Sequence, residues 1–436
     1  MKREKFGSRA GFVLSCIGAA IGLGNIWMFP YRLGQYGGAA FLIPYFIFVF
    51  LLGTVGLMTE FAFGRKFKGG SSTGIRKILE EKKIKGSKII SVIPAIGLMG
   101  VFMFYNVVVG WIIKYFGMSV TGEVNKVHIS TFFDSFAGSS STVVFNFIAI
   151  ALTLGIVYLG VSKGIENINK IIMPALFVIF ILLAIRSLTL PGAGEGVKYL
   201  LTPNWSFLLK PETWVMALGQ AFFTVSLNGC GMVVYGSYID SKFDIPKSAF
   251  STAILDTSAA LLVSFVIMPA VFSFGLDPQA GPPLLFITMP TIFKAMPGGH
   301  ILSVIFFLSI LFAAISSSIN MLEGPVEALM ERTKLSRKKA SILLAIVGFV
   351  LSIPLNLSMS NFDSFTNMMT VIISPIGALI VAVVFYYVYG GNKVLEAINI
   401  GAKRKVSKGF LIMGKYVFPI TTIGVIILGI IYGGIG

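Results

Sequence analysis

A hydrophobic segment near the start of the chain contains glycines where a membrane helix needs an unbroken backbone. Residues 10–33 form an apolar run, which is interrupted at its centre by Gly18, Gly22 and Gly24, with Asn25 directly after them. A glycine inside a helix costs roughly 1 kcal/mol relative to alanine, and backbone freed from helical hydrogen bonds inside a bilayer is tolerated only around a cavity. The segment therefore predicts a broken membrane helix beside a cavity.

A second apolar segment, residues 213–239, is interrupted in the same way at residues 223–231. The two interrupted segments are the first and the sixth along the chain, so each opens a run of five. Because five is odd, the second run crosses the membrane in the opposite sense. Two broken helices in corresponding places indicate a binding site at the centre of the membrane, and so a transporter.

Composition supports a membrane protein, since 56% of the residues are hydrophobic and only 12% are charged. A span needs about 20 residues, and the chain has eleven apolar stretches of about this length. They are residues 10–33, 39–64, 89–115, 143–161, 168–188, 213–239, 248–275, 301–330, 340–357, 365–389 and 409–435. We predict an all-α polytopic membrane protein with an inverted repeat of five plus five helices, broken helices 1 and 6, and an eleventh helix. It would be one domain, 1–436, with repeats at 1–188 and 213–389 and the last helix at 409–435.

The formal net charge of +17 could suggest nucleic acid, but its distribution argues against that partner. Basic residues concentrate in alternate loops, at residues 2–9, 65–88, 332–339 and 393–408, whereas residues 119–142 are nearly free of them. Cytoplasmic loops carry such an excess of Lys and Arg. We expect a multi-pass protein of the cytoplasmic (inner) membrane, surrounded by lipid, with its amino terminus inside and its carboxyl terminus outside.

Asp256 is an acidic residue in an otherwise apolar predicted span. A buried carboxylate without a partner is costly, and no basic residue lies in the hydrophobic middle of a span to pair with it. A bound cation is the simplest partner, although a protonated Asp256 that bonds a neighbouring helix is an alternative. The serines at 316–318 could likewise ligate an ion or only join helices, and the glycines of the first break could only allow close packing.

Two stretches are the most specific part of the sequence: Gly-Leu-Gly-Asn-Ile-Trp-Met-Phe-Pro at 22–30 and Gly-Gly-Ala-Ala-Phe-Leu-Ile-Pro-Tyr at 37–45. With the breaks and Asp256, they resemble the neurotransmitter:sodium symporter family over essentially the whole chain. The resemblance implies two sodium sites. The first would comprise Ala20, Asn25, Thr224 and Asp256 with the substrate carboxylate, and the second the carbonyls of Gly18, Ile21 and Ala313 with the hydroxyls of Ser316 and Ser317.

The same resemblance implies a site for an L-amino acid between the breaks. Its carboxylate would meet the half-helix end at Gly22 and Gly24, where helix amides favour an anion. The implied substrate residues are Ala20, Gly22, Gly24, Tyr105, Phe223, Thr224, Ser226, Gly229, Ser317 and Met321. The implied inner gate is Arg3 facing Glu331, with Ser237 and Tyr238 nearby.

The chain departs from the family pattern at three positions. Asp256 stands where relatives typically have Asn, so it would supply the negative charge that chloride supplies elsewhere, and we expect no chloride requirement. Gly229 stands where many relatives have an aromatic residue of the pocket wall, which would leave room for a bulky or aromatic substrate. Met28 replaces an arginine that pairs with an acid of span ten in close bacterial relatives, and Asp363 is the nearest candidate for that acid.

These features favour a sodium-coupled symporter that works by alternating access. An ion channel is a rival, but channels present repeated rings of ligands rather than one asymmetric cage. A sensor that binds an amino acid without moving it is another. The predicted spans contain no serine–histidine or metal-ligand constellation, which argues against an enzyme. The particular amino acid, the sodium stoichiometry, proton antiport and the oligomeric state stay open.

Overall fold

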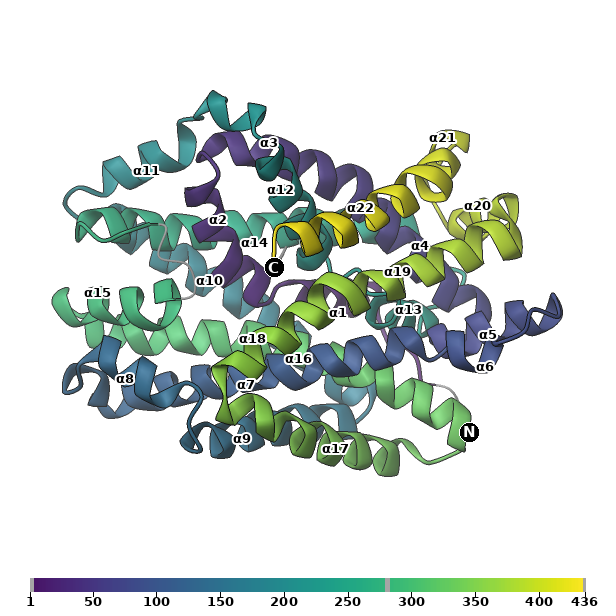
Figure 1. Ribbon diagram of the computed structural model, residues 1–436, viewed down its shortest axis with the longest axis horizontal. Helices are drawn as coiled ribbons and strands as arrows, with labels where there is room; N and C mark the ends of the chain where they lie inside the picture. Colours follow the sequence, from purple (N-terminus) through teal and green to yellow (C-terminus); the bar gives the residue numbers. More distant parts are fainter. Residues whose placement is uncertain (1–3, 279–282, 434–436) are drawn as a thin grey trace.

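The computed structural model describes residues 4–278 and 283–433, and the regular elements of these residues are helices. Nine of the helices there are long and apolar enough to cross a membrane, and one further pair, Arg9–Ala20 with Gly24–Gln35, passes this test as a span bent by 56°. Most of them run along the long axis of the molecule (Figure 1). The predicted all-α membrane architecture is confirmed.

The spans of the first half are built from the following elements. They are α1 (Arg9–Ala20), η1 (Gly24–Met28) and α2 (Phe29–Gln35); α3 (Ala39–Phe48), η2 (Val49–Gly53) and α4 (Thr54–Phe67); α7 (Ile93–Thr121); α9 (Ser141–Tyr158); and η4 (Val161–Glu166) with α10 (Asn167–Leu188). Shorter helices between them are α5 (Ser71–Glu81), α6 (Ser87–Ile90), α8 (Ile129–Phe136) and α11 (Ala193–Leu201).

The second half follows the same order. Its elements are α12 (Pro211–Thr224) and α13 (Gly231–Ser237); α14 (Ile245–Ser273); α16 (Gly299–Thr333); α17 (Arg337–Leu357); and α18 (Met359–Asn367) to α20 (Gly391–Asn399) through η7 (Met368–Ile373), α19 (Ser374–Val383) and η8 (Val384–Gly390). The eleventh span joins α21 (Lys408–Ile412), η9 (Met413–Val417) and α22 (Phe418–Ile431), and α15 (Met289–Ala295) lies in the long loop before α16.

The expected sixth span is broken, as predicted. With 14 and 7 residues, α12 and α13 are each too short to cross a bilayer alone, and residues 225–230 separate them. Together with the bent pair and the nine long helices, they account for the eleven expected spans.

The first broken helix lies at the centre of the bundle. Helix α1 packs against α10, α14 and α16, while α7 packs along α16. Phe12, Cys16 and Ile17 have no solvent exposure, so α1 is surrounded by protein rather than by lipid. A helix that is apolar on all faces is expected to be buried in this way.

The basic loops gather at one end of the bundle, which we call the basic end. Helices α5, α6, α20 and α21 lie at this end, whereas α8, α11 and α15 lie at the other (Figure 1). The apolar residues of α5, Ile75, Ile78 and Leu79, are buried, as expected for an amphipathic helix at the interface.

Candidate binding site at the two helix breaks

Asn25 organises the break in the first span. Helix α1 ends at Ala20, and Ile21 is extended, with φ −69° and ψ 103°. The amide of Gly22, which leaves the helical ladder here, donates to Oδ1 of Asn25 at 3.1 Å. The side chain of Asn25 thus satisfies a backbone donor that the break would otherwise leave unpaired inside the protein.

The second break is joined to the first by a serine in an unusual conformation. Ser226 has φ 56°, a left-handed value that is uncommon for a residue other than glycine. Its hydroxyl donates to the carbonyl of Ala19 at 2.8 Å. Asn228 accepts bonds from the amides of Cys230 and Gly231, both at 2.9 Å, and so satisfies the start of α13.

Between the breaks, three of the residues expected at the first sodium site lie in one cluster. Asn25 Nδ2 donates to Thr224 Oγ1 at 3.0 Å, to Asp256 Oδ1 at 2.8 Å and to the Asp256 carbonyl at 3.1 Å. Thr224 Oγ1 donates to Asp256 Oδ2 at 2.8 Å. All three side chains are buried, and Asp256 has no exposure at all. The fourth expected residue, Ala20, lines the neighbouring cavity.

The five residues expected at the second sodium site also converge. The hydroxyl of Ser316 donates to the carbonyls of Gly18 and Ala313, both at 2.8 Å. The hydroxyl of Ser317 donates to the carbonyls of Gly18 at 3.1 Å and Ile21 at 3.0 Å. The carbonyls that α1 releases near its end therefore face two hydroxyls of α16.

Both clusters have the chemistry of a hard monovalent cation site. Their polar atoms are oxygens apart from the Asn25 amide nitrogen, and the oxygen of that amide accepts the bond from Gly22. Oxygen ligands suit hard cations, whereas imidazole and thiolate suit zinc, copper or iron. Across residues 4–278 and 283–433, no three His, Cys, Asp or Glu side chains group as they would around a metal ion. The first cluster holds one carboxylate, Asp256, and the second holds none.

A cavity of about 50 Å³ lies next to the two clusters. Eight of the expected substrate residues line it: Ala20, Gly22, Gly24, Tyr105, Phe223, Ser226, Ser317 and Met321. A Cβ on Gly22 would come within 2.7 Å of both Ser317 Oγ and Tyr105 OH, and a Cβ on Gly24 would meet the ring of Phe223 at 2.7 Å. Glycine is therefore required here because the cavity wall is backbone.

Gly229, expected among the substrate residues, does not line this cavity. Gly229 has φ 72°, and a Cβ there would lie 2.2 Å from the carbonyl of Gly377 in α19 rather than in the cavity. Its amide donates to Glu60 Oε1 at 2.9 Å. The position is glycine because the left-handed backbone passes close to α19. Thr224 was also expected to meet the substrate, but it belongs to the cluster around Asp256 and not to the cavity lining.

Several polar residues of the site were missed in the sequence. Gln220 donates to the Gly24 carbonyl at 2.9 Å and accepts from Arg32 Nη1 at 3.1 Å. Arg32 is only 4% exposed, so this bond lies inside the protein. Asn228 and Asn320 line the cavity. A polar residue inside an apolar span was the available signal for Gln220 and Asn320, as it was for Asp256.

Of the expected inner gate, Arg3 lies outside the described residues, so its pairing with Glu331 stays a prediction. Glu331 Oε1 accepts a bond from Arg76 Nη2 at 2.8 Å. Ser237 donates to the carbonyl of Val234 within its own helix, at 2.6 Å. Tyr238 OH donates to Glu323 Oε1 at 2.5 Å.

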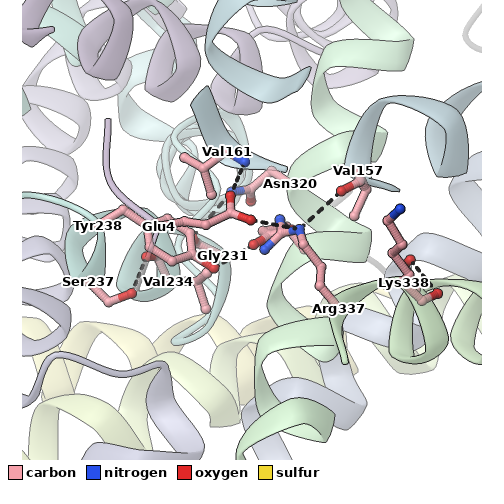
Figure 2. Close-up of polar contacts among 12 residues, drawn as sticks. Glu4, Val157, Val161, Gly231, Val234, Ser237, Tyr238, Asn320, Arg337 and Lys338 are labelled. Carbon is pink, nitrogen blue, oxygen red and sulfur yellow. Dashed lines mark hydrogen bonds and ion pairs between the residues drawn. The ribbon is translucent and has the colours of Figure 1, made fainter. Parts of the chain in front are cut away.

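Arg337 connects several of the polar residues near the expected inner gate. It forms an ion pair with the fully buried Glu323 and donates to the carbonyl of Val157 at 3.1 Å. Its Nε lies 3.8 Å from Glu4 Oε1, and Glu4 also accepts from the amide of Val161 (Figure 2). The segment before α1 is thus fastened to α17 and η4. We call Glu4, Tyr238, Glu323 and Arg337 the inner cluster.

Comparisons with known proteins show the family of this chain. The model of the sodium:neurotransmitter symporter family matches residues 3–143 and 125–433. The chain belongs to this family. It is 38% identical to an uncharacterised sodium-dependent transporter of Bacillus subtilis, YhdH, over 82% of this chain and 79% of the relative. It is 30% identical to such a transporter of Methanocaldococcus jannaschii, MJ1319, over 98% of this chain and 90% of that one.

A solved structure of the family is similar over nearly its whole length. The crystal structure of MhsT in complex with L-phenylalanine superposes with a TM-score of 0.88 at 34% identity, covering 98% of this chain and 99% of that chain. The sodium-dependent serotonin transporter of Drosophila melanogaster is 28% identical over 80% of this chain and 63% of its own length. The chain is accordingly a membrane transporter of a sodium-dependent symporter family, with the fold expected from its broken helices.

Proposed function

We propose that this symporter couples the entry of sodium to the uptake of a bulky hydrophobic or aromatic L-amino acid by alternating access. The observation that carries the proposal is the convergence of Asn25, Thr224 and Asp256 on a glycine-walled cavity. A substrate carboxylate at Gly22 would lie beside this cluster and complete it. Sodium and substrate would each supply the counter-charge of the other, which is a physical reason for coupled binding.

Two sodium ions fit the two oxygen clusters. The first would bind at Ala20, Asn25, Thr224 and Asp256, and the second at the Gly18, Ile21 and Ala313 carbonyls with Ser316 and Ser317. With Asp256 ionised, the first site carries its own negative charge, so transport requires no chloride. Backbone carbonyls in the second site bind a cation without any formal charge.

Two observations support a bulky substrate, and Gly229 is not one of them, because it does not line the cavity. The apolar residues Leu98, Val101, Leu227 and Met321 line the cavity, and the relative MhsT was solved with L-phenylalanine. Phe223 would cover the ligand as a lid. Glycine competing better than tyrosine for uptake would contradict this assignment.

Alternating access requires that one end of the site closes while the other opens. The inner cluster closes the basic end, which the charge bias assigns to the cytoplasm, with the amino terminus inside. Rocking of the repeat 1–188 against the repeat 213–389 would separate Glu4 from Arg337, and the helix at 409–435 would stay outside this movement.

The decisive experiment measures binding and transport on the same preparation. Purified protein is titrated with each of the twenty amino acids in sodium and in potassium, and uptake is then followed in proteoliposomes with an inward sodium gradient. We expect sodium to raise amino-acid affinity and the amino acid to raise sodium affinity by the same factor, because the coupling free energy is reciprocal. Sodium-dependent binding without uptake would identify a sensor and overturn the transport proposal.

A further inference from the structure

A second, larger cavity lies at the basic end, away from the helix breaks. It has a volume of about 420 Å³ and lies between the end of α4, the residues after α13 and the end of α20. We call it the basic pocket. Its lining includes four cationic side chains, Lys5, Arg65, Lys66 and Lys68, and one acidic side chain, Asp240. The pocket therefore has a formal surplus of three positive charges.

Arg65 holds the pocket together. Its guanidinium donates to the carbonyls of Phe243 at 2.8 Å, Ala397 at 2.6 Å and Ile400 at 3.0 Å, so it joins α4 to the loop before α14 and to the end of α20. These three bonds engage three of the five guanidinium N–H groups with backbone oxygens. The three lysines are the other cationic groups of the pocket.

The three lysines form no ion pair with a carboxylate of the described residues. Within the described part of the chain, no Asp or Glu oxygen lies within salt-bridge distance of the ammonium of Lys5, Lys66 or Lys68. Lys5 and Lys68 are exposed, and Lys66 lies 6.0 Å from the centre of the Tyr389 ring. A cavity lined by four cationic side chains and a single carboxylate, Asp240, attracts an anion.

The position of the basic pocket indicates which kind of anion would bind there. The apolar spans Ala39–Phe67 and Met359–Asn399 both end at it, which places it at the level of the lipid headgroups. Ile400 follows the second of these spans and is 45% exposed. Basic pockets between transmembrane helices on the cytoplasmic side bind the headgroups of anionic lipids.

We propose that the basic pocket binds the phosphate of an anionic phospholipid through Lys5, Lys66 and Lys68. Lys5 directly precedes Phe6, whose amide donates to the Tyr238 carbonyl at 3.2 Å. A phosphate that bridges Lys5 and the lysines of α4 therefore fastens the segment before α1 to the bundle. Lipid binding then stabilises the conformation in which the inner cluster is closed.

Native mass spectrometry of the purified full-length chain tests this proposal. The protein is titrated with phosphatidylglycerol and, separately, with phosphatidylcholine. The triple variant Lys5→Gln, Lys66→Gln, Lys68→Gln is compared with a matched control, Lys82→Gln, Lys83→Gln, Lys85→Gln, which removes the same charge from exposed residues of the same basic loop. We expect the first variant to lose at least about tenfold in phosphatidylglycerol affinity and the control to change less than about twofold. Equal losses in the two variants would overturn the proposal.

Two further measurements keep the result clear. If the triple variant does not fold, the single variant Lys66→Glu takes its place. Folding of this variant is checked by measuring sodium-dependent amino-acid binding at the cavity between the two helix breaks. Inorganic phosphate is titrated in parallel. Bound phosphatidylglycerol that millimolar phosphate does not displace supports a lipid site, whereas saturable binding of phosphate with no preference for phosphatidylglycerol over phosphatidylcholine assigns the pocket to a free anion and refutes the lipid.

Discussion

The side-chain amide of Asn25 lies 2.8 Å from Oδ1 of Asp256, although 231 residues separate them in the sequence. One residue belongs to the break of the first span, and the other to the continuous helix α14. The contact brings a released backbone segment and a buried carboxylate together. We expect the binding of both ions and substrate to depend on it.

Asp256→Asn should reduce the sodium affinity of the first site by at least tenfold, about 1.4 kcal/mol. The substitution keeps the shape of the side chain and removes the charge that the bound cation would face. Sodium titrations of amino-acid binding measure the effect. Asp363→Asn is a control, because Asp363 is exposed on α18. Unchanged sodium affinity in the Asp256 variant would show that the carboxylate is protonated in the working site.

Replacement of chloride should leave the transport rate of the wild-type chain unchanged. Asp256 supplies a negative charge at the first site, so no mobile anion is needed there. Uptake into sealed vesicles in sodium chloride is compared with uptake in sodium gluconate. A collapse of uptake in gluconate would mean that Asp256 does not balance the sodium charge.

Gly22→Ala should abolish substrate binding and lower the free energy of unfolding by about 1–3 kcal/mol, because the methyl group overpacks a buried site. The new methyl group would lie 2.7 Å from Ser317 Oγ and from Tyr105 OH, and so would fill the cavity where the substrate carboxylate is expected. Equilibrium binding and the thermal unfolding midpoint are measured together. Gly155→Ala in α9 is the matched control, because its Cβ would have no atom within 4 Å. Wild-type affinity in the Gly22 variant would place the substrate elsewhere.

Arg337→Gln should destabilise the protein by about 3–5 kcal/mol, since it leaves the buried carboxylate of Glu323 without its ion-pair partner. The double variant Arg337→Gln, Glu323→Gln removes both charges and should recover part of this loss. The free energies of unfolding of the wild type, of Arg337→Gln, of Glu323→Gln and of the double variant form a double-mutant cycle. Strictly additive losses would show that the two side chains do not interact.

The sequence was sufficient for the fold because breaks, spans and basic loops are local patterns. It also identified the residues of both oxygen clusters, since Asp256 is conspicuous in an apolar helix and the family pattern supplied its neighbours. The surroundings of Gly229 could not be predicted from the sequence, because only its backbone angle φ of 72° and its close approach to Gly377 show that the residue turns toward α19.

The ion pairs of the basic end could not be foreseen for a different reason. Charged residues are abundant there, so composition does not select partners among them. Glu331 meets Arg76 of helix α5, and Glu323 meets Arg337 from the start of the next helix. Such pairings depend on how helices are offset along one another, which a hydrophobic pattern does not specify.

The bond from Ser226 to Ala19 also bears on how the chain is assembled during synthesis. The carbonyl of Ala19 receives this hydroxyl from a residue that the ribosome adds about two hundred positions later. Until α12 has been inserted, the opened backbone of the first half has no such partner, and apolar lipid offers none. Completion of the first break is therefore a late event in biogenesis, and a truncated chain that ends before α12 should be a preferred target of membrane quality-control proteases.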